Sequence, residues 1–113
     1  MAVSRGEVWF ADLSTTRGSE QSGTRPVLIV QTDRANATSP NSIIIPFTTR
    51  IRKKLFPSHV LVPAGEAGLT QDSVALAEQI RVMDLARLIR KLGQLPTARI
   101  QEVDDALRAI LDL

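Results

Sequence analysis

The apolar residues of this chain fall into short runs separated by glycine, proline and other turn-forming residues. This spacing constrains the fold more than any other feature, because it predicts many short strands. Short strands at regular spacing are typical of a small closed or half-closed barrel. The predicted strands cover residues 7–13, 25–31, 42–47, 59–62, 73–77, 79–83 and 88–95. The run VLIV at residues 27–30 is continuously apolar, which indicates burial on both faces.

The last part of the chain has a different period. Apolar residues between positions 97 and 111 recur at spacings of three and four, which predicts an amphipathic helix on or beside the barrel. These residues are Ile100, Val103, Leu107 and Ile110. Asp104 and Asp105 are expected on the outer face of this helix. The predicted fold is therefore mainly β, of the α+β class, with a C-terminal helix.

Length and composition predict one domain over residues 1–113, since a domain usually spans about 100–200 residues. There are no cysteines, which excludes a disulfide framework, thiolate metal ligands and a cysteine nucleophile. The N-terminus reads directly into the first predicted strand, and no apolar run approaches the roughly 20 residues that span a bilayer. We therefore expect a soluble, cytoplasmic protein with no membrane partner.

The charge is unevenly distributed, although the formal net charge is only +2. Residues 1–60 carry eight Arg and Lys against four Asp and Glu, and the remainder carries six against eight. Eleven of the fourteen cations are arginine, whose planar fork matches a phosphate better than the point charge of lysine. This distribution favours nucleic acid or another anion as a partner, although a dipolar surface is common among proteins.

Several kinds of chemistry lack the residues that they need. Metal sites use clustered His, Cys or carboxylates, and this chain has one histidine and no paired motif. No glycine-rich phosphate loop precedes a helix, and no nucleophile-elbow motif accompanies His59 for a serine triad. Cleavage by two histidines is impossible within one chain. We expect no metal and no other cofactor.

Polar residues near the ends of strands remain as candidates for a site. Arg25 stands between a polar loop, residues 14–24, and a buried strand. Loops of that length without secondary structure of their own often bind ligands or cover a site. Arg25 is therefore predicted to be a cation that a rigid strand holds beneath the loop.

Further candidates have two interpretations each. Thr48 and Thr49 end a strand, and they are either functional hydroxyls or ordinary β-branched strand residues. Strand alternation places Gln79 and Arg81 on one face, which is either a binding face or a solvated barrel surface. His59, the one histidine, is either a catalyst or a structural hydrogen-bonding residue.

Five blocks of the sequence resemble the MazF/PemK family of toxin endoribonucleases. The blocks are RGEVWFADL, GSEQSGTRPVLIVQ, IIPFTT, DSVALAEQIRVMD and IQEVDDALRAIL. The resemblance covers nearly the whole chain, and the order and spacing of the blocks match as well. It implies a small SH3-like barrel of the CcdB/MazF/Kid type with a terminal helix.

The resemblance also implies an activity and partners. The implied protein is the toxin of a toxin–antitoxin pair, a homodimer that holds single-stranded RNA, most readily mRNA, in a groove across its interface. The implied reaction is metal-independent cleavage at a short sequence, in which a 2′-hydroxyl attacks phosphorus and leaves a 2′,3′-cyclic phosphate and a 5′-hydroxyl. The implied inhibitor is a MazE-like antitoxin with an acidic tail, and DNA is contacted only indirectly, through the antitoxin complex.

The resemblance assigns roles to individual residues. Arg25 and Thr48 match the family residues that are regarded as catalytic. The residues expected to bind RNA are Ser19, Glu20, Gln21, Thr49, Arg50, Arg52, Gln79 and Arg81. One branch of the family uses an acid and an arginine two residues before it. Here Glu78 occupies the acid position but Leu76 the arginine position, which favours the mechanism that uses Arg25 and Thr48.

The general base is left open among Arg25, Glu78 and His59, the last from either subunit. A guanidinium suits charge stabilisation at phosphorus, but it holds its proton to about pH 12 and is a poor base. Thr48 can hydrogen-bond a phosphate oxygen but is no base. Only four aromatic residues are present, so polar contacts are expected to dominate base recognition.

Two other functions are compatible with the same fold. A CcdB-like poison that binds gyrase needs an interaction surface and no acid–base residues. An inactive RNA-binding member of the family is the third alternative, and the presence of both Arg25 and Thr48 weighs against it.

Overall fold

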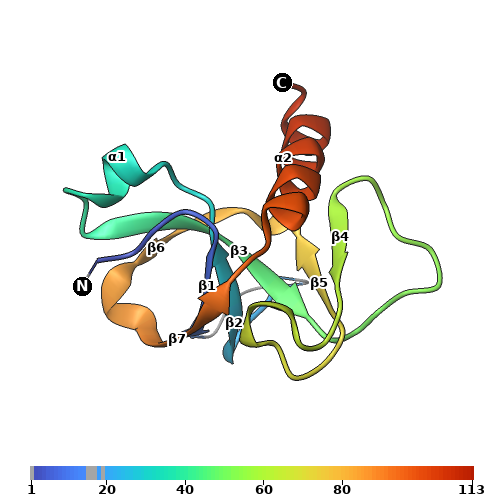
Figure 1. Ribbon diagram of the computed structural model, residues 1–113, viewed down its shortest axis with the longest axis horizontal. Helices are drawn as coiled ribbons and strands as arrows, with labels where there is room; N and C mark the ends of the chain where they lie inside the picture. Colours follow the sequence, from blue (N-terminus) through green and yellow to red (C-terminus); the bar gives the residue numbers. More distant parts are fainter. Residues whose placement is uncertain (1, 15–17, 19) are drawn as a thin grey trace.

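The computed structural model of the chain describes residues 2–14, 18 and 20–113. Within them, seven strands form one curled antiparallel sheet in the order β4-β5-β3-β2-β1-β7, with β6 paired to β3 (Figure 1). The strands are β1 (Glu7–Asp12), β2 (Thr24–Ile29), β3 (Asn41–Thr48), β4 (His59–Val62), β5 (Ser73–Leu76), β6 (Arg81–Asp84) and β7 (Leu88–Gln94). The helices are α1 (Asp33–Asn36) and α2 (Thr97–Leu111). The prediction of a mainly β fold with a C-terminal helix is confirmed.

Both faces of the central strands are buried. Val27 and Ile29 of β2 belong to one apolar cluster, and Leu28 between them belongs to a second cluster. In β3 the neighbours Ile44 and Ile45 divide in the same way, because successive side chains of a strand point to opposite faces. The prediction that the apolar run of β2 is buried on both faces holds for these three residues, and Val30 is half-buried.

Helix α2 covers one of the two clusters. It packs against β4 (Figure 1). Its buried side chains are those of Val103 and Ala106. The prediction was wrong for Ile110, which is 45% exposed near the end of the helix, beyond the sheet. It was also wrong for Asp104, which is only half exposed and forms an ion pair with Arg5. Since this pair joins α2 to the N-terminal segment, only Asp105 lies on the outer face.

A second correction concerns the segment between β5 and β6. Residues 79–83 were predicted as one strand, but Ala77–Gln79 forms a 3₁₀ turn and β6 begins only at Arg81. Phe47 pairs with Ala75 and Ile44 pairs with Arg81, so the chain opposite β3 contains three extra residues at this point. Gln79 and Arg81 therefore do not share the face of one strand. We call residues 77–79 the bulge.

The sequence of β3 offers a reason for the bulge. Ile45 and Pro46 are the β3 residues without a paired partner on the edge that carries β5 and β6. Proline has no N–H, so this part of the ladder can be opened at a smaller cost in hydrogen bonds. The extra residues are anchored instead by a bond from the Ala77 N–H to the Ser58 carbonyl oxygen, 3.0 Å long.

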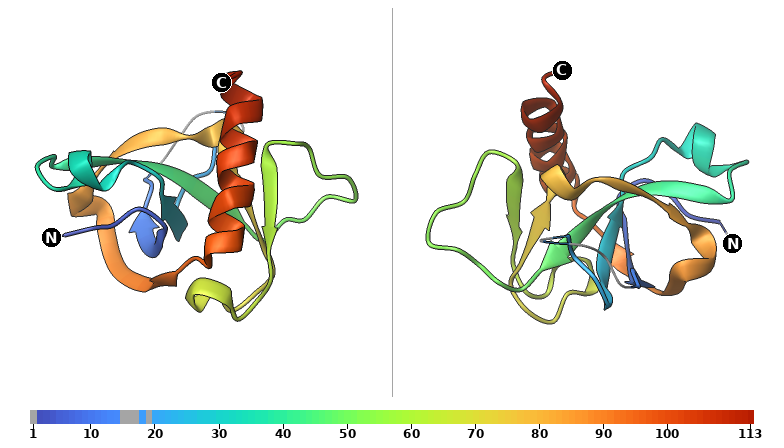
Figure 2. Two further views of the ribbon diagram at one scale, coloured as in Figure 1. Left: turned by 45° about the horizontal axis from the view of Figure 1, so that its top comes forward. Right: turned by 180° about the vertical axis from the view of Figure 1, so that it is seen from behind.

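Two elements that flank the sheet lie at opposite ends of the molecule. The loop of residues 49–57 projects from the molecule on the side of β4 and α2, and the short helix α1 lies at the opposite end (Figure 2). Helix α1 lies in the connection between β2 and β3. None of the helices among the described residues is long and apolar enough to cross a bilayer.

Candidate functional site

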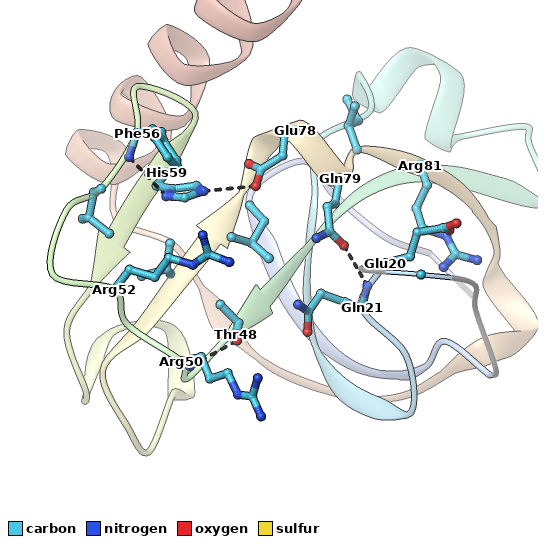
Figure 3. A pocket seen from close by; sticks show the side chains of 15 residues that line it. Glu20, Gln21, Thr48, Arg50, Arg52, Phe56, His59, Glu78, Gln79 and Arg81 are labelled. Atoms are coloured by element: carbon cyan, nitrogen blue, oxygen red, sulfur yellow. Dashed lines mark hydrogen bonds and ion pairs between the residues drawn. The ribbon is translucent and has the colours of Figure 1, made fainter.

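A pocket of about 780 Å³ opens where four segments meet: the end of β3, the loop 49–57, the bulge and the residues just before β2 (Figure 3). Most of the predicted site residues line it. They are Glu20, Gln21, Thr48, Arg50, Arg52, His59, Glu78, Gln79 and Arg81. The remaining lining residues are Gly18, Leu55, Phe56, Val74, Leu76 and Ile80. Residues from distant parts of the sequence thus form one concave surface.

Three predicted residues are not part of this lining. Arg25 lies next to the pocket rather than on its wall, and Thr49 is exposed outside it. Ser19 lies outside the described residues. Residues 15–17 of the loop 14–24 also lie outside the described residues. The predicted role of this loop in covering the site therefore stays a prediction.

Arg25 is held by backbone carbonyls. Its Nε donates to the Ser22 carbonyl oxygen at 2.8 Å, and its Nη1 donates to the Phe47 carbonyl oxygen at 3.2 Å. Burial lowers the pKa of the Arg25 guanidinium because it disfavours the charged form, although arginine remains a cation at neutral pH. Since Phe47 precedes Thr48, the positive charge is fixed beside the Thr48 end of the pocket.

Thr48 ends β3 with its side chain in the pocket. Its Oγ1 accepts a hydrogen bond of 3.1 Å from the Arg50 N–H, which turns the chain into the loop 49–57 (Figure 3). The hydroxyl proton of Thr48 stays available for an acceptor such as a phosphate oxygen. The same turn brings Arg50 and Arg52 to the wall of the pocket.

His59 and Glu78 contact each other at the other side of the pocket. His59 Nε2 lies 3.0 Å from Glu78 Oε2, and His59 Nδ1 accepts from the Phe56 N–H at 3.2 Å (Figure 3). The Phe56 ring meets the imidazole edge to face, with ring centres 5.3 Å apart. The contact between His59 and Glu78 was not predicted, because nothing in the sequence links two residues nineteen positions apart.

The bulge contributes the third group of contacts. The Gln79 side-chain oxygen accepts a bond of 2.7 Å from the Gln21 N–H, which joins the bulge to the segment before β2. At the start of β6, Arg81 Nη1 is buried, and no other described residue accepts a hydrogen bond from it. An unsatisfied buried donor in a native protein calls for an explanation, and a ligand acceptor is one.

The pocket is basic and contains no ready metal site. Arg50, Arg52 and Arg81 outnumber the carboxylates Glu20 and Glu78 on its wall. Among the described residues there is no group of three or more His, Cys, Asp or Glu side chains that could hold a metal ion. An anionic ligand fits these charges.

Sequence reasoning missed the apolar part of the pocket wall. Phe56 is 52% exposed, and Leu55 lies beside it in the loop 49–57. Only polar and charged residues of this loop had been predicted to belong to the site. The one available signal was an aromatic residue within a charged loop, where no core contact explains it. An exposed aromatic ring is a surface on which a nucleobase can stack.

Residues 4–111 match the family described as PemK-like, MazF-like toxin of type II toxin–antitoxin system. This chain belongs to the PemK/MazF toxin family. It is 46% identical over 113 residues to the endoribonuclease EndoA of Bacillus subtilis strain 168, with 100% of this chain and 97% of the relative covered.

Solved structures of the family agree with the fold. The crystal structure of MazF (Form-I) from Deinococcus radiodurans has a TM-score of 0.85 and 26% identity, covering 100% of this chain and 99% of that one. The MazE-MazF (Form-II) structure from the same organism has a TM-score of 0.79 and 25% identity, over 100% and 98%. The predicted family and fold are therefore confirmed.

Proposed function

We propose that this PemK/MazF-family chain is the RNA-cleaving toxin of a type II toxin–antitoxin pair, and that its basic pocket holds single-stranded RNA. The observation that carries the proposal is the meeting of Thr48 and Glu78 on the wall of one basic pocket, with Arg25 beside it. The similarity to a Bacillus subtilis endoribonuclease supports the same activity.

In the proposed chemistry the 2′-hydroxyl gives up its proton and attacks the adjacent phosphorus, and the bond from phosphorus to the 5′-oxygen breaks. The 5′-oxygen takes up a proton from solvent and leaves as a 5′-hydroxyl. The Thr48 hydroxyl donates to a phosphate oxygen, and the Arg25 cation stabilises the negative charge that develops there. The Arg25 Nη1 lies 3.2 Å from the carbonyl oxygen of Phe47, the residue before Thr48, so the cation lies beside the Thr48 end of the pocket. A carboxylate such as Glu78 is a better acceptor for the 2′-hydroxyl proton than a guanidinium is.

A homodimer and an antitoxin complete the proposal. Ile43 of β3 and Val82 of β6 pair across the strands and are 37% and 62% exposed, beside the start of β6 that carries Arg81. A second copy that covers this apolar pair would place two pockets along one groove. An acidic antitoxin tail complements the same basic pocket, and a MazE-MazF complex from Deinococcus radiodurans has this fold. We expect the pair to act in the cytoplasm.

The test is incubation of the purified protein with a mixed pool of single-stranded RNA, with and without a chelator. Cleavage that persists in chelator and leaves cyclic phosphate ends supports the proposal, and sequencing of the ends gives the recognition site. The matched variants are Arg25→Ala, which should abolish cleavage, and Arg34→Ala, an exposed arginine of α1 away from the pocket. Intact RNA together with stalled gyrase would instead establish a CcdB-like poison.

A further inference from the structure

His59 has two different contacts, and together they fix where its proton lies. Nδ1 accepts a hydrogen bond from the Phe56 N–H at 3.2 Å, so this nitrogen carries no proton. The proton of the neutral ring must then lie on Nε2, which donates to Glu78 Oε2 at 3.0 Å. The side chain of His59 is only 8% exposed, so water does not compete freely for either contact.

This arrangement removes His59 from the candidates for the general base. The one ring nitrogen with a lone pair already accepts from the Phe56 N–H and points toward the backbone of the loop 49–57. The Glu78 carboxylate is different, because it accepts one bond from His59 and has further lone pairs on two oxygens. It is 34% exposed at the pocket wall and can be reached by a substrate hydroxyl.

The two contacts also connect separate parts of the pocket. Phe56 lies at the end of the loop 49–57, which carries Arg50 and Arg52, whereas Glu78 lies on the bulge. The backbone strengthens the connection, since the His59 N–H donates to the Phe56 carbonyl oxygen at 2.9 Å. His59 itself is fixed in β4, where it pairs with Leu76 just before the bulge.

We infer that His59 is a positioning residue with two functions: through Nε2 it orients the Glu78 carboxylate as the base, and through Nδ1 it holds the loop that carries the RNA-binding arginines. The inference rests on the proposed RNA cleavage for its kinetic consequences. The tautomer of His59 and its two contacts can be tested independently of any activity.

Two conservative substitutions separate the two functions. In His59→Gln the amide nitrogen takes the place of Nε2, so the donor to Glu78 is kept and the acceptor for Phe56 is lost. In His59→Asn the amide oxygen takes the place of Nδ1, so the acceptor for Phe56 is kept and the donor to Glu78 is lost. Each variant is the matched control of the other, because both replace the ring by a neutral amide.

The kinetic test measures kcat and KM on an RNA that carries the mapped cleavage sequence. We expect His59→Asn to lose kcat on the order of ten- to a hundredfold with little change in KM, since a misplaced catalytic group costs about that much. We expect His59→Gln to raise KM several-fold with kcat nearly kept. Adding Glu78→Gln to His59→Asn should cause little further loss. Equal effects of both variants on both parameters, or no effect, would overturn the inference.

If the wild type cleaves no RNA, the proposed function is refuted. The tautomer of His59 and its two contacts can still be tested, by nuclear magnetic resonance. Long-range ¹H–¹⁵N correlation should show His59 with its proton on Nε2, and hydrogen exchange of the Phe56 amide should accelerate in His59→Gln but stay slow in His59→Asn. A proton on Nδ1, or a Phe56 amide that ignores both substitutions, would refute the positioning role.

Discussion

Arg81→Met is predicted to have opposite effects on folding and on RNA binding. Arg81 Nη1 is buried, and no described residue accepts a hydrogen bond from it. A buried donor without a partner costs about 1–3 kcal/mol of stability. Methionine keeps the unbranched apolar stem and removes the guanidinium, so most of the packing against the pocket wall is retained.

The expected magnitudes follow from that geometry. Removing an unsatisfied donor should leave the free energy of unfolding unchanged or raise it by about 1 kcal/mol, which is roughly 4 °C in Tm for a domain of this size. A hydrogen bond from a charged donor to an RNA acceptor is worth about 1.5–3 kcal/mol. Its loss should weaken binding by roughly ten- to a hundredfold.

The assay combines thermal unfolding with binding of a 2′-O-methyl RNA, which cannot be cleaved because the nucleophile is blocked. Arg34→Met is the control, since it removes the same charge from the exposed face of α1, at the other end of the molecule (Figure 2). The control should change neither quantity appreciably. A clear loss of stability in Arg81→Met with full RNA affinity would refute the reasoning, because Arg81 would then be a structural residue.

Three other predictions concern separate parts of the molecule. Thr48→Ala should lower the single-turnover cleavage rate by about tenfold or more while RNA binding is largely retained, because we propose that the hydroxyl donates to the reacting phosphate. Gly68→Ala should lower Tm far more than Gly65→Ala: both glycines have positive φ, but only at Gly68 would a Cβ lie 2.1 Å from the Leu92 carbonyl oxygen. Burial alone would raise the pKa of Glu7, but hydrogen bonds from Trp9, the Ser4 N–H and Lys91 outweigh it and lower the pKa below 4.5. The contribution of Glu7 to the free energy of unfolding is therefore present above about pH 4.5 and is lost as the pH falls through the lowered pKa. Glu7→Gln should remove this part of the pH dependence of stability, measured by urea unfolding.

Much of the fold could be predicted because it depends on local patterns. The strand of residues 59–62 and the helix of residues 97–111 have the predicted bounds, since each follows from the period of its own apolar residues. The bulge could not be predicted in this way. AEQIRV alternates like a strand, and only the pairing of β3 with both β5 and β6 shows that three residues are extra.

The candidate site could also be predicted only in part. Thr48 was found from its place at the end of a strand, and Arg50 and Arg52 were assigned to RNA binding through the family resemblance. The structure puts all three on one pocket wall. Arg25 was expected to face the substrate, whereas its guanidinium donates to the carbonyl oxygens of Ser22 and Phe47. Its catalytic role stays a prediction.

The sequence by itself determined which segments are strands, which segment is the helix, and which cations stand at strand ends, because these properties depend on neighbouring residues. Only the tertiary structure decided that His59 contacts Glu78 and the Phe56 N–H, and that Arg81 has a buried donor beside the pocket. Those contacts depend on how β3, β4 and the bulge are aligned, and alignment is a property of long-range strand pairing that no local pattern contains.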